Sequence, residues 1–226
     1  MSSIANLEPL VLEQLQSLSL DPARPLIISD ADEVLLKFVA GLETYLQGRD
    51  MWLDLQSFAL SGNIKRKNTN EIIATEEVPD LLSDFFAAAT GDLEAVTGAA
   101  DALAALHKRG AQIIVLTNVP HAQRHVRQEC LARQGLDYPV IANQGLKGPA
   151  VTYLAQQCEG PFFFLDDIPH NIASVAKAHA PTKCIHFIAD KRLAQLIDPA
   201  KDSQIQSSSW PHTHAYIENE LAQLGH

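Results

Sequence analysis

Residues 24–36, which read RPLIISDADEVLL, decide the fold expected for this chain. The apolar run Leu26–Ile28 lies between a proline and two carboxylates, Asp30 and Asp32, which is the pattern of a short buried strand. Ligands of open parallel sheets bind beyond the carboxyl ends of the strands, so both aspartates are expected beside one small volume. Taken alone, the pair fits a catalytic site and an exposed turn alike.

Further apolar runs after residue 98 alternate with stretches of helical spacing. We expect strands at residues 26–29, 112–116, 138–142, 162–165 and 184–188. We expect helices at 6–18, 99–109, 120–134, after 149, from 170, at 191–197 and at 212–223, with a polar serine-rich loop before the last. This alternation predicts an α/β fold, a Rossmann-like doubly wound parallel sheet with helices on both faces.

The segment between the first strand and residue 99 is longer than a crossover needs. Its spacing predicts helices at 36–46, 50–60 and 78–89 and no strand. A polar loop at 61–70 holds the basic run Lys65, Arg66 and Lys67, which fits an anion-binding patch and a solvated loop alike.

Polar residues stand at the ends of the expected strands. They are Asp30 and Asp32, Thr117 and Asn118, Asp166 and Asp167, with Lys147 at a further strand-to-helix connection. Each has an ordinary structural explanation, such as helix capping. Four carboxylates on one edge of a sheet, however, repel one another and need a cation, and an all-oxygen donor set suits Mg²⁺. A lysine, a hydroxyl and free backbone N–H groups beside them suit an oxyanion such as phosphate.

In four motifs the chain resembles the haloacid dehalogenase-like hydrolases, most of which are Mg²⁺-dependent phosphatases. The motifs are IISDADEVL at 27–35, IIVLTN at 113–118, KGP at 147–149 and FFLDDIPHN at 163–171. The resemblance covers residue 24 to about 190. It implies a catalytic core made of residues 1–35 and 99–226, and a small helical cap made of residues 36–98.

The resemblance implies catalytic roles for two aspartates. Asp30 would be the nucleophile that takes the phosphoryl group as an aspartyl-phosphate, and Asp32 would protonate the leaving oxygen and then deprotonate the attacking water. The implied reaction is the hydrolysis of a small phosphorylated metabolite, because a capped site suits a small phosphate monoester.

The resemblance also implies how charge is held at the site. Thr117 and the Asn118 backbone would hold the phosphoryl oxygens, and Lys147 would neutralise charge on the nucleophile. The Asp30 carboxylate, the Asp32 carbonyl and Asp167 would bind Mg²⁺. Asp166 would be either a further ligand or a partner of Lys147.

Two departures from the family pattern leave other functions open. Glu33 stands where relatives often have glycine, and Asn171 where many have an acid. The alternatives are a catalytically weak phosphometabolite-binding protein of the same fold and a 2-haloacid dehalogenase. Asp32 favours the phosphatase, because a halide leaving group needs no general acid.

The composition of the chain limits the kinds of binding partner and the cellular compartment that we expect. The formal net charge is −10, from 17 basic and 27 acidic residues, which argues against binding to nucleic acid or an acidic membrane surface. The three cysteines are widely separated, residues 1–20 lack the pattern of a signal peptide, and no window reaches the length of a membrane span. We therefore expect a cytoplasmic protein whose partner is a small molecule.

Overall fold

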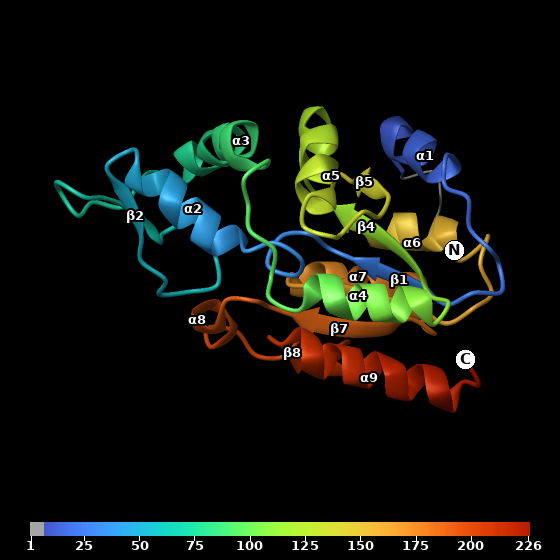
Figure 1. Cartoon of the computed structure of the whole chain (residues 1–226). Coiled ribbons are helices and arrows are strands. Elements are labelled where there is room, and N and C mark those ends of the chain that lie inside the picture. Colours follow the sequence, from blue (N-terminus) through green and yellow to red (C-terminus); the bar gives the residue numbers. More distant parts are fainter. Residues whose placement is uncertain (1–6) are drawn as a thin grey trace.

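The computed structural model describes residues 7–226, and its central feature is a six-stranded parallel sheet (Figure 1). From edge to edge the strands are β5 (Val140–Ala142), β4 (Gln112–Thr117), β1 (Leu26–Ser29), β6 (Phe162–Asp166), β7 (Lys183–Phe187) and β8 (Ile205–Ser207). All five neighbouring pairs are parallel. β1, which contains Leu26–Ile28, therefore lies inside the sheet, between the two strands whose ends carry the other polar motifs.

Helices pack against both faces of the sheet. The helices of the core are α1 (Pro9–Gln16), α4 (Ala99–Lys108), α5 (Arg124–Ala132), α6 (Gly148–Leu154), α7 (Pro169–Ala178), α8 (Lys191–Ala194) and α9 (Trp210–Gln223). Alternate residues of β1 enter two separate hydrophobic clusters: Ile27 packs with α4, α5 and α9, whereas Ile28 packs with α1, α6 and α7. This alternation is what a strand buried on both faces requires, and it confirms the predicted α/β architecture.

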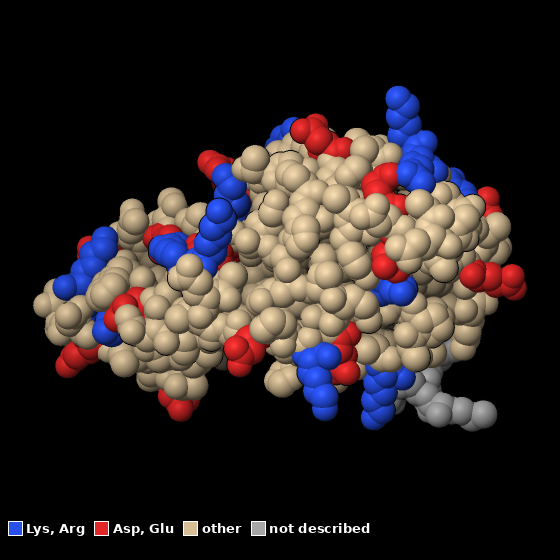
Figure 2. All heavy atoms as spheres, turned by 90° about the horizontal axis from the view of Figure 1, so that it is seen from below, with Lys and Arg blue, Asp and Glu red and all other residues tan. Residues whose placement is uncertain are grey.

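The segment between β1 and α4, which we call the insertion (residues 36–98), forms a smaller lobe beside the sheet (Figures 1 and 2). It contains α2 (Phe38–Gln47), α3 (Val78–Ala89), the 3₁₀ turn η2 (Thr75–Glu77) and an antiparallel hairpin of β2 (Met51–Leu53) and β3 (Ile64–Arg66). On the face in Figure 2, basic side chains are interspersed with acidic ones over both lobes.

The two chain segments that join the lobes run side by side. The Lys37 N–H donates to the Glu94 carbonyl at 2.9 Å, and the Val96 N–H donates to the Leu35 carbonyl at 2.8 Å. The side chains of Lys37 and Glu94 form an ion pair at 3.0 Å beside these bonds. The chain thus enters and leaves the insertion through one short pair of hydrogen-bonded segments.

Three sequence predictions need correction. The helix expected at 50–60 is wrong, because Met51–Leu53 is a strand that pairs with Ile64–Arg66. The serine-rich loop contains β8, and the helix expected from residue 120 begins as the 3₁₀ turn η3 (His121–Gln123) before α5. Each of these elements is three residues long or begins in a turn, and a hydrophobic period is not measurable over so few residues.

Residues 1–6 lie outside the described residues. They include the start of the helix predicted at 6–18 and part of the N-terminal stretch for which we expect no signal peptide. Cys130, Cys158 and Cys184 are buried and free. None of the described helices has both the length and the apolar character needed to cross a membrane.

Candidate active site

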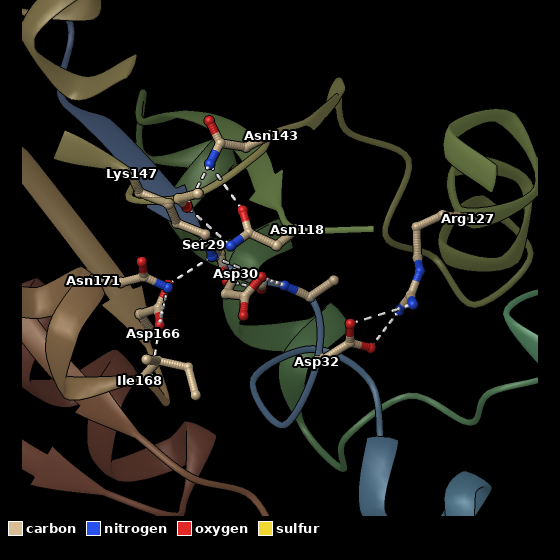
Figure 3. A network of polar contacts seen from close by, with 12 residues as sticks. Ser29, Asp30, Asp32, Asn118, Arg127, Asn143, Lys147, Asp166, Ile168 and Asn171 are labelled. Carbon is tan, nitrogen blue, oxygen red and sulfur yellow. Dashed lines mark hydrogen bonds and ion pairs between the residues drawn. The ribbon is translucent and has the colours of Figure 1, made fainter. Parts of the chain in front are cut away.

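The carboxyl edge of the sheet collects the polar residues that the sequence singles out (Figure 3). Asp30 follows β1, Asn118 follows β4, and Asp167 follows β6. Because β1 is hydrogen-bonded to both β4 and β6, these three strand ends are neighbours. Lys147, which immediately precedes α6, reaches the same edge.

Lys147 is fully buried and joins two carboxylates. Its Nζ lies 2.8 Å from Asp30 Oδ1 and 2.6 Å from Asp166 Oδ2. Burial lowers the pKa of Lys147, but the adjacent Asp166 and Asp30 carboxylates outweigh it and hold that pKa above its ordinary value. The ammonium is therefore a fixed positive charge at the centre of the site.

The Asp30 carboxylate is held by one oxygen. Oδ1 accepts a hydrogen bond from the Ala31 N–H at 2.7 Å, and the contact with Lys147 falls on the same atom. Neither contact involves Oδ2, the other oxygen of the Asp30 carboxylate. A carboxylate fixed through one oxygen presents the other in a defined direction, as a nucleophile or a metal ligand requires.

Three carboxylates stand close enough to share one cation. Asp30, Asp166 and Asp167 each offer an oxygen, and these oxygens lie within 4.8 Å of one another. Burial raises the pKa of Asp166 to about 6, and burial together with Asp166 and Asp30 raises the pKa of Asp167 well above its ordinary value. Two raised carboxyl pKa values beside one lysine indicate an excess of negative charge that a divalent cation relieves, and carboxylate oxygens fit Mg²⁺.

Asp166 already uses both oxygens within the protein. It accepts from Lys147, from the Ile168 N–H at 2.9 Å, and from Asn171 Nδ2 at 3.0 and 3.2 Å. Asn171, which departs from the family pattern, is buried and acts here as a donor to Asp166. These bonds favour a role for Asp166 as a partner of Lys147 rather than as a metal ligand that faces the cavity.

The Asp32 carboxylate lies outside the cluster of three. Arg127 of α5 binds it through two nitrogens, with Nη1 2.7 Å from Oδ1 and Nη2 3.3 Å from Oδ2 (Figure 3). The Arg127 side chain is fully buried, while that of Asp32 is 18% exposed. Burial raises the pKa of Asp32, and Arg127 opposes that rise.

Sequence reasoning missed Arg127. A signal was present, since Arg127 stands three and four positions before Cys130 and Leu131, on the buried face of α5. A basic residue on the apolar side of a helix needs a buried acidic partner.

The residues expected to bind phosphate have different surroundings. Thr117 is buried, and its Oγ1 has no hydrogen-bond partner among the described residues. The Asn118 side chain is committed to structure: it donates to the Gly145 carbonyl at 3.0 Å and accepts from Asn143 Nδ2 at 2.8 Å. This network ties the end of β4 to the loop that carries Lys147. A buried hydroxyl without a partner fits a role in binding an oxyanion.

Glu33 lies in the turn between β1 and α2 and not in a helix. Its φ is 57°, a left-handed conformation that explains why glycine suits this position. Its buried carboxylate accepts from the Val39 N–H and from the Asp190 N–H, both at 2.7 Å. Burial raises the pKa of Glu33 to about 7 despite these bonds. The glutamate thus connects the first turn of α2 in the insertion to the loop after β7.

A cavity of about 210 Å³ opens at these residues, between the sheet edge and the insertion. Asp30, Asp32, Lys147 and Asp167 line one side of it. The basic residues of the insertion do not line it. Lys65 pairs with Asp54 at 2.6 Å, Arg66 pairs with Glu77 at 2.8 Å, and Lys67 donates to a backbone carbonyl.

Comparison with known proteins identifies the fold. No protein-family model matches the sequence, and no curated protein does. Among solved structures, the chain is similar to a HAD family hydrolase from Deinococcus radiodurans R1 with bound phosphate and sodium, at 17% identity and a TM-score of 0.57 over 90% of this chain and 97% of that one.

It is also similar to a predicted phosphatase from Clostridium acetobutylicum (15% identity, TM-score 0.56, 87% and 99% coverage). A dehalogenase has 12% identity and a TM-score of 0.52, over 88% of this chain and 98% of that one. The chain therefore has the fold of the haloacid dehalogenase-like hydrolases, as its four motifs predicted.

Proposed function

We propose that this protein is a Mg²⁺-dependent phosphatase that hydrolyses a small phosphate monoester through an aspartyl-phosphate at Asp30. The observation that carries the proposal is the placement of Asp30 Oδ1 against Lys147, in a cluster with Asp166 and Asp167. A phosphoryl group brings negative charge to the site, so catalysis depends on fixed positive charge and on positioning.

In this proposal the residues at the edge have different tasks. Asp30 Oδ2 attacks phosphorus, and Lys147 stabilises the charge of the attacking carboxylate and the phosphoryl oxygens. Asp32 protonates the leaving oxygen and then takes a proton from water. The Thr117 hydroxyl and the Asn118 N–H hold phosphoryl oxygens.

Asp30, Asp167 and the Asp32 carbonyl would hold Mg²⁺, with Asp166 supporting Lys147 beside them. When bound, Mg²⁺ would neutralise the charge of the carboxylates and of the phosphoryl group.

Phosphate release with and without Mg²⁺ tests the proposal. The wild-type protein should release phosphate from an aryl phosphate only with Mg²⁺, and Asp30→Asn should abolish turnover while folding normally. Asp137→Asn, at an exposed aspartate in a loop, is the matched control and should keep full activity. Metal-independent turnover, or an active Asp30→Asn protein, would refute the assignment.

A 2-haloacid dehalogenase is the second candidate, because a dehalogenase is among the similar structures. It predicts halide release from a 2-haloacid, which we do not expect. A carbon–halogen bond breaks without a general acid, and Asp32 lines the cavity where such an acid is needed.

The proposal extends to the insertion and the cellular setting. We infer that residues 36–98 act as a cap, with residues 1–35 and 99–226 as the catalytic core, since residues of both parts line the cavity. Three free, buried cysteines fit a reducing compartment such as the cytoplasm, and a small-molecule partner fits a cavity of this size.

A further inference from the structure

The cavity beside Asp30 has two chemically different sides. The sheet edge supplies charged groups, while the side facing them is apolar. The insertion contributes Phe38, Val39, Phe58, Leu60 and Phe86 to it, and the core adds Ile168 and Leu193. If Asp30 attacks a phosphoryl group, these apolar residues surround the alcohol that leaves.

No free positive charge is available for that alcohol among the described residues that line the cavity. Lys147 is the one basic residue there, and it is shared between Asp30 and Asp166. Arg127, which lies behind Asp32, is committed to that carboxylate. A second carboxylate or phosphate on the substrate would face Asp32 and Glu33 with no counter-charge, which is costly in a partly buried site.

Hydrogen-bonding groups for a sugar or polyol are also missing from the apolar side. The two amides in the lining, Asn118 and Asn171, are bonded to Asn143 and Asp166 respectively. Hydroxyls of a polar alcohol would lose water there and gain no partner. An aromatic or aliphatic group, in contrast, gains from leaving water and from contact with aromatic rings.

The size of the cavity indicates how much of this group it can bury. A cavity of about 150 Å³ lined by apolar side chains holds one benzene molecule. The present cavity of about 210 Å³ must also admit the phosphoryl group. It therefore accommodates a single ring or a short branched chain next to the phosphate.

We propose that the substrate is the phosphate monoester of an uncharged, apolar alcohol about the size of one aromatic ring. This inference rests on the proposed phosphatase function and specifies its substrate class. The residues that select the alcohol are Phe58 and Phe86 of the insertion, which line the cavity together with Asp30.

Matched esters test the selection. Benzyl phosphate, glycerol 1-phosphate and 3-phosphoglycerate are suitable, because the first two release primary alcohols of similar reactivity and the third adds a carboxylate. We expect kcat/KM for benzyl phosphate to exceed that for glycerol 1-phosphate at least about tenfold, with 3-phosphoglycerate the poorest. A preference for either polar ester would overturn the inference and leave the phosphatase function intact.

A charge placed in the cavity tests the site directly. Phe58→Lys should raise the ratio of kcat/KM for 3-phosphoglycerate to that for benzyl phosphate about tenfold or more, because it supplies the missing counter-charge. Ile72→Lys is the control, since Ile72 is in the same insertion, 54% exposed and outside the cavity lining. An unchanged ratio in Phe58→Lys, or an equal change in both variants, would contradict the inference.

Binding separates this inference from catalysis. Benzylphosphonate has a C–P bond that is not hydrolysed, and it should raise the Tm of the Mg²⁺-loaded protein more than 2,3-dihydroxypropylphosphonate does. This order should hold in Asp30→Asn as well. If no ester is hydrolysed, the phosphatase proposal fails, and the order of the two phosphonates still decides the substrate class. The reverse order would refute it.

Discussion

Lys147 is the residue on which the charge balance of the site depends. It is completely buried between Asp30 and Asp166, and both contacts are shorter than 3 Å. Removing one partner of a buried ion pair leaves the other charge without compensation, which costs more than the pair itself contributes. The motif Lys147–Pro149 in the sequence pointed to this lysine, but only the fold shows that it touches two carboxylates at once.

Replacing Lys147 should destabilise the protein and stop catalysis. We expect Lys147→Met to lower the free energy of unfolding of the metal-free protein by about 3–5 kcal/mol, measured by urea denaturation. Lys183→Met is the control, since Lys183 and Glu220 form a partly exposed pair at 2.9 Å that should contribute less than about 1 kcal/mol. Equal losses in the two variants would show that Lys147 carries no special electrostatic role.

Arg127 fixes the orientation of Asp32 by two hydrogen bonds. Lysine keeps the positive charge but not the two-pronged geometry, so Arg127→Lys should lower kcat about tenfold with little change in KM. Arg124→Lys is the control on the same helix, because Arg124 contacts a backbone carbonyl of β5 and not the site. A faster Arg127→Lys enzyme would mean that Arg127 holds Asp32 away from the leaving group.

At the scale of elements, five of the six strands of the central sheet were predictable, whereas β8 was not. β1, β4 and β6 are apolar runs that end abruptly in polar residues, and all are buried along their full length. The hairpin of β2 and β3 was not predictable, because a strand of three residues is too short to show a hydrophobic period. Its pairing depends on non-local contacts, such as Lys65 Nζ lying 5.4 Å from the centre of the Trp52 ring.

Glu33 joins the insertion to the core, and its two roles can be separated. Glu33→Ala removes the acceptor of two N–H groups but keeps the unfavourable positive φ, so we expect a loss of about 1–3 kcal/mol in unfolding free energy. Glu33→Gly removes the same acceptor and relieves the φ, so it should be about 1 kcal/mol more stable than Glu33→Ala. Identical stabilities in urea would contradict the conformational part of this argument.

A second contact between the insertion and the core is an exposed ion pair, which provides a comparison. Arg192 of α8 binds Glu43 of α2 at 2.8 and 3.0 Å, but its side chain is 56% exposed. Arg192→Ala should therefore change stability by less than about 1 kcal/mol. A larger effect than that of Glu33→Ala would place the main attachment of the insertion at its surface.

His186 of β7 links two buried segments and predicts a pH dependence of stability. Its Nδ1 accepts from the Ala200 N–H at 3.1 Å, so Nε2 carries the proton and donates to the Asp167 carbonyl at 2.9 Å. Burial lowers the pKa of His186 below 6.5, its unfolded value. The unfolded chain therefore takes up this proton first as the pH falls, and the contribution of His186 to stability decreases below about pH 6.5. This contribution is opposite in sign to that of the carboxyl groups with raised pKa values, Glu33, Asp166 and Asp167.

Urea denaturation between pH 7 and pH 5.5 checks this sign. Relative to the wild-type protein, His186→Gln should become more stable as the pH falls from 7 to 5.5, because it lacks the destabilising contribution of the histidine. His125→Gln, at a histidine with an 87% exposed side chain, should keep the wild-type slope. A wild-type slope in His186→Gln would show that His186 makes no such contribution.

At the scale of the whole molecule, the fold creates the site by bringing together strand ends that are far apart in sequence. Residues 30, 117, 147 and 167 were predictable because parallel strands share one carboxyl edge. Arg127, Asn143 and the apolar cavity wall were not. They come from a helix, a loop and the insertion, whose placement depends on packing between segments far apart in sequence. The spacing of Arg127 indicates a buried position on α5, but not that its partner is Asp32.

The charge of the carboxylate cluster should govern the stability of the entire protein and its response to Mg²⁺. The raised pKa of Asp167 means that ionising it is unfavourable without a cation, so Asp167→Asn should raise the Tm of the metal-free protein. Mg²⁺ at about 100 times its dissociation constant should stabilise the wild-type protein by about 2.7 kcal/mol. For a chain of this length that corresponds to roughly 5–10 °C in Tm, whereas Asp167→Asn should respond much less.

Thermal unfolding with EDTA and with Mg²⁺ distinguishes the two effects in one experiment. The order of the two Tm values should reverse between the conditions. In EDTA the Tm of Asp167→Asn should be the higher one, and in Mg²⁺ the Tm of the wild-type protein should be the higher one. Asp137→Asn, at an exposed loop position, should follow the wild-type protein in both conditions. A Tm of Asp167→Asn that is lower in EDTA and rises as much as wild type in Mg²⁺ would mean that repulsion among these carboxylates is not what the metal relieves.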